Sequence, residues 1–311
     1  MEQQNKEQKK SLKHFLFEIY DKKYKLLLII PFALLIFSIL QISYQVYSTG
    51  DFLNKDVSLK GGITFTVPVN KDYNEDKVTQ HFSSRFQVGT STRVLTSGGK
   101  QIGIILQAEI DPNNEELSQK FLKEIESYFG ITDKDYSIEV TGPTLGRSFF
   151  VELLLASGLA FLLMSIVVFI SFRTFIPSMA VILAAFSDIL FALAMTNALN
   201  IKIGAGGIAA FLMLIGYSVD TDILLSTRVL KRAEGTVFER IVEAYKTGIT
   251  MTITAIAAVT IGLVFTQSEV IRQIMFILLM GLLADIPNTW IQNVGILRLY
   301  LERKEKKMQV R

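Results

Sequence analysis

The chain has 311 residues, half of them hydrophobic, and its apolar residues form long uncharged runs separated by charged segments; this composition is typical of a membrane protein. It has no cysteine and only two histidines, His14 and His81, which excludes disulfides, thiolate catalysis and cysteine-based or histidine-rich metal sites. A net charge of +3 is too small to favour nucleic acid as a partner, and the basic residues gather beside the apolar runs as topology signals do.

The first predicted element is a membrane-spanning helix over residues 26–47, after a polar, lysine-rich tail of residues 1–25. An uncharged run of this length crosses the roughly 30 Å hydrocarbon core as a helix. A cleavable signal peptide is the alternative, but its apolar region is about 7 to 15 residues long and ends in small residues. The tyrosines near the end of the run, Tyr44 and Tyr47, fit an aromatic interface belt instead.

Residues 48–148 have the composition of a soluble protein and predict one small α+β domain. From Leu59 to Val67 the residues Ile63, Phe65 and Val67 alternate with threonines, as in a half-buried strand. The other elements follow in chain order: a helix opened by a capping box at Asp72–Glu75, two strands joined at Gly98-Gly99, a helix with Leu117, Phe121, Ile125 and Phe129 on one face, and a strand over residues 135–140. The order β-α-β-β-α-β predicts a ferredoxin-like antiparallel sheet with both helices on one face.

This domain offers no chemistry that an enzyme would need. Its sequence contains no Ser-His-Asp grouping, no Walker-type phosphate loop and no clustered acidic metal ligands. His81 is interpreted as a helix-surface residue, with proton sensing as the alternative. We therefore expect no enzymatic activity and no bound cofactor or metal.

Five further apolar runs bring the predicted spans to six and make up a transmembrane domain over residues 149–298: 149–172, 175–198, 203–225, 249–265 and 274–297. A cytoplasmic N-terminus puts the lysine-rich tail, the basic segment after the fourth span and the basic tail of residues 299–311 on the cytoplasmic side. Residues 48–148 are then extracytoplasmic, and the protein is expected in the plasma membrane with both termini in the cytoplasm.

Four aspartates fall within the spans, at Asp188, Asp220, Asp222 and Asp285, and no lysine, arginine or histidine lies deep in any span. The carboxyls therefore either carry protons and form hydrogen bonds with Ser, Thr, Asn or the backbone, or meet a cation of a partner chain. A carboxylate whose protonation depends on the side that it faces is what a proton-coupled machine requires.

Each of these aspartates also has a structural interpretation. Asp220 and Asp222 are about 200° apart on an α-helix and cannot face the same cleft. Asp220 lies deeper in the span and is favoured as the inward carboxylate, with Asp222 near the cytoplasmic interface, although either is a candidate for the functional group. For Asp188 the alternative is polar helix packing, and for Asp285 it is local capping of a kink at Pro287.

The layout of one span, a ferredoxin-like outer domain and five further spans resembles the SecF family, the smaller partner of SecD in protein export and a relative of the resistance-nodulation-division (RND) superfamily. The resemblance rests on three segments: Gly142-Pro-Thr-Leu-Gly146, Phe172-Arg173, and Gly216-Tyr-Ser-Val-Asp-Thr-Asp222. The last is similar to archaeal members. Bacterial members usually read Gly-Tyr-Ser-Ile-Asn-Asp-Thr, so their functional aspartate falls at Thr221 and its role passes to Asp220 or Asp222.

The resemblance implies a SecD homologue as partner, a position beside the Sec translocation channel within the lipid bilayer, and a role in moving or releasing exported unfolded polypeptides. A proton gradient, or a sodium gradient, would drive this through the four aspartates. The supporting residues are Asn197, Gly216, Tyr217, Ser218 and Thr221. One alternative is a half-transporter of the same superfamily that exports small molecules or lipids. Another is an intramembrane aspartyl protease, but its usual Tyr-Asp and Gly-x-Gly-Asp contexts are absent.

Overall fold

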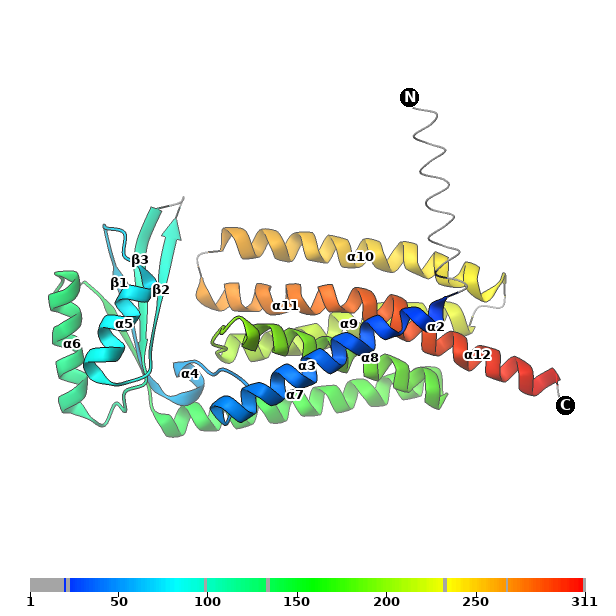
Figure 1. The fold of residues 1–311 in the computed structure, drawn as a ribbon, viewed down its shortest axis with the longest axis horizontal. Coiled ribbons are helices and arrows are strands. Elements are labelled where there is room, and N and C mark those ends of the chain that lie inside the picture. The colour runs from blue at the N-terminus through cyan, green and yellow to red at the C-terminus, as the bar shows by residue number, and fades with distance from the viewer. Residues whose placement is uncertain are drawn as a thin grey trace, which may run out of the picture.

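A bundle of long helices carries a small α+β domain at one end (Figure 1) in the computed structural model, which describes residues 20, 23–97, 100–132, 135–231, 234–266 and 268–309. Among these residues, six helical segments are long and apolar enough to cross a membrane, which agrees with the six predicted spans: Tyr24–Thr49, Pro143–Phe172, Phe175–Ala198, Ala205–Lys231, Val237–Phe265 and Val270–Lys307.

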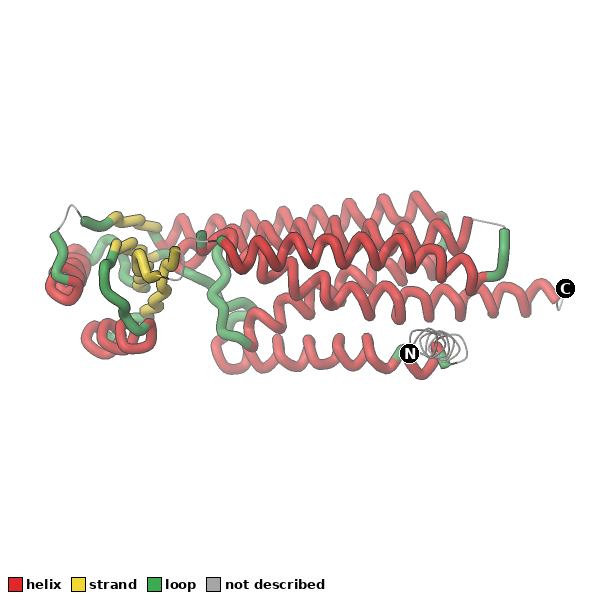
Figure 2. Tube along the Cα trace, turned by 90° about the horizontal axis from the view of Figure 1, so that it is seen from above, coloured by secondary structure: helices red, strands yellow, loops and turns green. Residues whose placement is uncertain are grey.

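The elements of the bundle run alongside one another in both views (Figures 1 and 2). In chain order they are α2 (Tyr24–Leu27), α3 (Ile29–Thr49), α7 (Pro143–Phe172), α8 (Phe175–Ala198), α9 (Ala205–Lys231), α10 (Val237–Phe265), α11 (Glu269–Pro287), the π-helical segment η1 (Asn288–Asn293) and α12 (Val294–Gln309). At least half of the most apolar stretch of α8 and of α9 is buried, against 6% for α7 and 11% for the first span. Helices α8 and α9 therefore form the centre of the bundle.

The outer domain has the predicted order of elements: β1 (Gly62–Pro68), α5 (Glu75–Phe86), β2 (Thr90–Ser97), β3 (Lys100–Ala108), α6 (Glu115–Phe129) and β4 (Ser137–Thr141). The strands pair antiparallel in the order β2-β3-β1-β4, which confirms the ferredoxin-like fold. Its core is aromatic, since Phe65, Phe82 and Phe121 are each 0% exposed. The ring centroid of Phe121 lies 5.6 Å from that of Phe65 and 5.1 Å from that of Phe82.

Two local predictions in this domain are wrong. Residues before Gly61 form a short helix, α4 (Val57–Lys60), rather than the start of a strand, because the Asp56 carboxylate accepts a hydrogen bond from Ser58 N and caps the turn. Helix α5 is capped by Asn74, which accepts from Lys77 N, and not by a box beginning at Asp72. The predicted turn residues Gly98 and Gly99 lie outside the described residues, while the strands beside them pair as expected.

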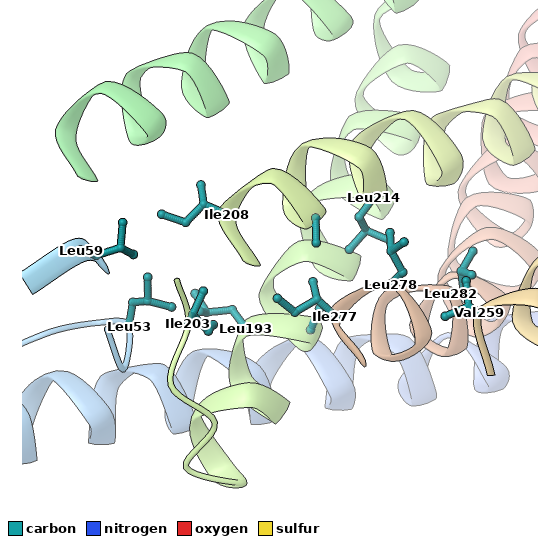
Figure 3. Packing of buried hydrophobic residues seen from close by; sticks show 12 residues of the cluster. Leu53, Leu59, Leu193, Ile203, Ile208, Leu214, Val259, Ile277, Leu278 and Leu282 are labelled. Atoms are coloured by element: carbon teal, nitrogen blue, oxygen red, sulfur yellow. The ribbon is translucent and has the colours of Figure 1, made fainter. Parts of the chain in front are cut away.

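The segment that links α3 to the outer domain is fastened to the loop between α8 and α9. Ile203 N donates to Asn54 O at 2.7 Å, and Asp56 N donates to Ile203 O at 3.0 Å. Leu53 and Leu59 of this segment belong to the same apolar cluster as Ile203 and Ile208 (Figure 3). The outer domain is thus held at the end of the bundle where α9 begins.

Candidate functional site

Three of the four intramembrane aspartates converge in the interior of the bundle. Asp188 comes from α8, Asp222 from α9 and Asp285 from α11, and each is 0% exposed. Charge interactions connect all three carboxyls, so they lie within one network, which we call the carboxyl network. The fold therefore brings together carboxyls that are as much as 97 positions apart in the sequence (285 − 188).

Asp188 has one hydrogen-bond donor for each of its carboxyl oxygens. Ser218 Oγ donates to Oδ2 at 2.6 Å, and Asn288 Nδ2 donates to Oδ1 at 2.7 Å. Ser218 lies four residues before Asp222 on α9, so both side chains share one helix face. Asp188 is thus supported by α9 and by η1 at the same time.

Asp222 and Asp285 share a hydroxyl. Thr289 Oγ1 lies 3.0 Å from Asp222 Oδ1 and 2.8 Å from Asp285 Oδ1. Asn293 Nδ2 also donates to Asp222 Oδ1, at 2.7 Å. The other oxygen of Asp222, Oδ2, is buried without a hydrogen-bond partner among the described residues.

The polar residues of η1 were missed at the sequence level. Asn288, Thr289, Gln292 and Asn293 are at most 1% exposed and follow Asp285 at spacings of 3, 4, 7 and 8, which is one face of a helix. That spacing was the available signal. The π-helical turn begins directly after Pro287, which has no N–H for the ladder of α-helical hydrogen bonds.

Among the residues that the structure describes, no cation pairs with the carboxyl network. Across the described ranges, no lysine, arginine or histidine forms an ion pair with Asp188, Asp222 or Asp285. Arg228, six residues after Asp222 in α9, donates to Glu243 O at 2.9 Å. Within the described part of this chain, the hydrogen-bond partners of the three carboxyls are the neutral side chains of Ser218, Asn288, Thr289 and Asn293.

The predicted orientation of the two α9 aspartates is wrong. Asp222 is 0% exposed and Asp220 is exposed. Depth along the span suggested the opposite, but the buried face of α9 is set by Leu214, Ser218 and Leu225, which pack into the bundle. Asp222 lies on that face, and the 200° between the two aspartates turns Asp220 away from it.

The supporting residues divide between three places. Ser218 belongs to the carboxyl network, and Thr221 is buried beside it with its hydroxyl 3.5 Å from Tyr217 O of the same helix. Gly216 and Tyr217 are exposed next to Asp220. Asn197 lies at the far end of α8, where Nδ2 donates to Phe52 O at 2.9 Å and fastens the linker.

A second group of charges joins the outer domain to the bundle. Glu109 Oε1, at the end of β3, lies 3.1 Å from Lys60 Nζ and 3.9 Å from Lys202 Nζ in the loop between α8 and α9. Burial lowers the pKa of Lys202, and the nearby Glu109 carboxylate opposes that shift. Burial also lowers the pKa of Arg93 in β2, and the negative charges of Asp56 and Glu75 partly offset this by raising it.

Comparison with known proteins gives consistent matches. Residues 121–303 match the family described as protein export membrane protein SecD/SecF, C-terminal. The chain is 37% identical over 293 residues to the protein-export membrane protein SecF of Methanocaldococcus jannaschii, covering 92% of this chain and 99% of the relative. It is 38% identical to the SecF of Methanothermobacter thermautotrophicus, covering 90% and 94%.

A solved structure of SecDF from Thermus thermophilus, described as a translocon-associated membrane protein, superposes with a TM-score of 0.66 at 16% identity. The match covers 93% of this chain and 42% of that chain, so this chain spans about two fifths of the SecDF polypeptide. A second SecDF structure, in a super-membrane-facing form, gives a TM-score of 0.55 at 17% identity. At these identities the likeness is one of fold.

Proposed function

The chain belongs to the SecD/SecF family of protein-export membrane proteins, as a multi-pass accessory subunit, and from this premise we propose that proton flow through the carboxyl network drives its action in export. One observation carries the proposal: Asp188, Asp222 and Asp285, each 0% exposed, lie together on three spans with no pairing cation among the described residues.

Protons have a direct mechanical effect on such a network. A charged carboxylate in a dry interior costs several kcal/mol unless it is neutralised. Two ionised carboxylates in the same network also repel each other strongly, because the local dielectric constant is low. Adding or removing one proton therefore changes how closely α8, α9 and α11 can pack.

The outer domain is connected to the helix that carries Asp222. Helix α9 begins at Ala205, two residues beyond Ile203, which is hydrogen-bonded to Asn54 and Asp56 of the linker. A displacement of α9 is passed to the linker through these bonds. Changes in protonation near the membrane centre then move the domain that meets the exported polypeptide.

The partner is a SecD homologue that packs against the exposed stripe of α9, defined by Met213, Gly216, Tyr217 and Asp220. These residues recur at spacings of three and four, so they lie on one helix face. An aspartate facing hydrocarbon is costly, and a donor or cation of a partner helix removes that cost. The SecDF chains, more than twice the length of this one, support an arrangement with a SecD half.

The distribution of basic residues supports the orientation. Lysines and arginines gather in the N-terminal tail, after α9 and in the C-terminal tail, so these segments are cytoplasmic and the outer domain lies on the opposite side of the plasma membrane. There it meets unfolded polypeptides as they leave the Sec translocation channel, while lipid surrounds the exposed faces of α3 and α7. Sodium is the alternative coupling ion.

The test compares Asp222→Asn with Asp220→Asn in the assembled complex. Export of a secreted reporter into membrane vesicles is measured with no gradient, with a proton gradient and with a sodium gradient alone. We expect Asp222→Asn to abolish the stimulation by the proton gradient while gradient-independent export continues. In the complex that forms with Asp220→Asn, export should still be stimulated by the proton gradient, because the carboxyl of Asp220 lies outside the carboxyl network.

If Asp222→Asn still responds fully to the proton gradient, the proton pathway is wrong, although the accessory role in export stands. Stimulation of the unsubstituted complex by a sodium gradient alone would assign the coupling to sodium.

A further inference from the structure

Thr289 Oγ1 lies between two carboxyl oxygens that come from different spans. It is 0% exposed, 3.0 Å from Asp222 Oδ1 and 2.8 Å from Asp285 Oδ1. Both distances are those of ordinary O–H···O hydrogen bonds. The three atoms therefore form a continuous hydrogen-bonded chain from α9 to α11/η1.

The number of hydrogen atoms available limits how much negative charge these three hydrogen-bonded groups can carry. A threonine hydroxyl has a single hydrogen, so it donates to one carboxyl and can only accept from the other. A carboxyl that donates must itself be protonated. At least one proton therefore resides on the pair Asp222 and Asp285, because two ionised carboxylates would leave a hydroxyl lone pair facing a negatively charged oxygen.

The side-chain amide of Asn293 indicates in which direction the hydrogen bonds run along Asp285, Thr289 and Asp222. Asn293 Nδ2 donates to Asp222 Oδ1 at 2.7 Å, so this oxygen receives a second donor and is suited to the negative charge. Across the described hydrogen bonds, Asp285 Oδ1 has the Thr289 hydroxyl as its partner. In the resting state of the proposed relay, the proton is therefore assigned to Asp285, which donates to Thr289, which in turn donates to Asp222.

We propose that the Thr289 hydroxyl is the proton carrier between Asp285 and Asp222. The O–H bond of Asp285 breaks as its proton moves to Thr289 Oγ1, and the hydrogen of Thr289 moves at the same time to Asp222 Oδ1. One proton has then passed from α11 to α9, the negative charge has moved from Asp222 to Asp285, and Thr289 is again a neutral hydroxyl. The proposal rests on the proposed function, for which it supplies the step between two spans.

The other groups of the carboxyl network do not bridge Asp222 and Asp285. The third ionisable group of the network, Asp188 on α8, has Ser218 and Asn288 as its own donors and no hydrogen bond to Thr289. Helix α10 contributes Thr252, which lies against Asp285, and none of the interactions described for this carboxyl involves a charged group of α10. Among the described residues, Thr289 is the single side chain hydrogen-bonded to both Asp222 and Asp285.

The test uses three variants of the full chain in complex with its partner. Thr289→Val keeps the shape and removes the hydroxyl, while Thr289→Ser keeps the hydroxyl. Thr254→Val is the matched control, because the Thr254 hydroxyl donates to Thr250 O of its own helix and is exposed. Proton uptake into proteoliposomes is followed with an enclosed pH dye, and the carboxylic-acid carbonyl band is recorded by infrared spectroscopy.

We expect proton uptake to fall about 100-fold in Thr289→Val, the lower end of what a positioned proton-transfer group contributes. Uptake should stay at the unsubstituted level in Thr289→Ser and Thr254→Val. In the infrared spectrum, the carbonyl band that Asp285→Asn removes should shift in Thr289→Val and stay in place in Thr289→Ser.

Normal uptake in Thr289→Val together with lost uptake in Asp222→Asn overturns the role of Thr289 and leaves the proposed function intact. An equal loss in Thr289→Ser and Thr289→Val also overturns it, because packing rather than the hydroxyl would then matter. If the unsubstituted complex conducts no protons, the proposed function fails. The infrared spectrum tests the role of Thr289 independently of proton uptake. If Thr289→Val leaves the carbonyl band of Asp285 in place, the proposed role of Thr289 is overturned.

Discussion

A single glycine, Gly248 of α10, sets how closely α10 approaches the carboxyl network. A Cβ at this position would lie 2.3 Å from Trp290 Cζ2. Trp290 is 3% exposed and is the residue after Thr289 in η1. The absence of a side chain at Gly248 therefore lets the indole, and with it the Thr289 backbone, occupy the position seen here.

We expect Gly248→Ala to displace Trp290 and destabilise the protein by about 1–3 kcal/mol, the range for overpacking a filled interior. Because η1 moves with Trp290, gradient-stimulated export should fall as well. The measurement is thermal unfolding of the purified protein in detergent, followed by the export assay.

The matched control is Gly158→Ala on α7, where an added Cβ meets no atom within 4 Å. That variant should unfold at the temperature of the unsubstituted protein. Equal melting temperatures for all three proteins would mean that the indole can move aside without consequence, against the tight fit inferred for Gly248.

At the scale of residues, the sequence showed which aspartates fall within the spans but not which of them face the interior of the bundle. Four aspartates in apolar runs are visible in the sequence because charge is rare there. Which of Asp220 and Asp222 faces inward depends on how α9 is rotated against α8 and α11, and that rotation is set by packing. Position along the span carries no information about it.

Helix α9 has one face buried in the bundle and one face exposed on its surface, and this is a property of the whole element. Its buried face carries Ser218 and Asp222, and its exposed stripe carries Met213, Gly216, Tyr217 and Asp220. A Cβ at Gly216 would meet no atom of this chain within 4 Å. A larger side chain at position 216 therefore has room within this chain, and it would contact only a molecule that packs against the exposed stripe of α9.

We therefore expect Gly216→Leu to leave the stability of the isolated chain unchanged and to weaken its association with the SecD homologue. Co-purification of the two chains at equal expression, together with thermal unfolding of this chain alone, measures both effects. Gly158→Leu introduces the same side chain into similarly open surroundings on α7. If both substitutions reduce association alike, the stripe of α9 is not the specific contact surface.

The last span shows what sequence patterns can and cannot reveal about an element. Its apolar run and Asp285 are evident, and Pro287 predicts a departure from the α-helix. The polar face of η1 was hidden because Asn288, Thr289, Gln292 and Asn293 are uncharged and occur in the second half of a long span. Their spacing becomes meaningful once Asp285 is known to face the interior.

At the scale of the whole molecule, the outer domain is positioned by contacts between segments far apart in the sequence. Glu109, the residue after β3, lies near Lys202 in the loop between α8 and α9, and the N–H and C=O of Ile203 are both hydrogen-bonded to the linker. The ion pair is partly exposed, with side-chain exposures of 33% for Glu109 and 19% for Lys202. Its contribution is therefore small, and docking depends on several contacts together.

We expect Lys202→Gln to weaken docking by about 0.5–1 kcal/mol, typical of a partly exposed ion pair. Amide hydrogen exchange at Ile203 and Asp56, whose N–H groups bond across the junction, should accelerate by about twofold to fivefold. Lys71→Gln, at an exposed position of the outer domain, is the control and should leave both amides unchanged. Unaltered exchange in Lys202→Gln would remove Lys202 from the contacts that hold the domain.

The general architecture was accessible from the sequence because long apolar runs and alternating strands are local patterns. Six spans and a β-α-β-β-α-β domain follow from them directly. The parallel bridge between Lys55 and Ile203 joins positions 148 apart (203 − 55), and no local pattern records it. The attachment of the domain to α9 therefore emerges only in three dimensions.

The length of α7 has a consequence for the height of the outer domain above the bilayer. Its 30 residues extend about 45 Å at 1.5 Å per residue, whereas the hydrocarbon core is about 30 Å thick. The surplus of about 15 Å makes the helix a rigid stalk, and the close approach of Gly146 to Gly61, where an added Cβ would lie 2.8 Å from Gly61 N, anchors the domain against it. Because the length of α7 is fixed, the part that projects beyond the hydrocarbon core depends on the thickness of the bilayer, and a thinner membrane places the outer domain further from the membrane surface.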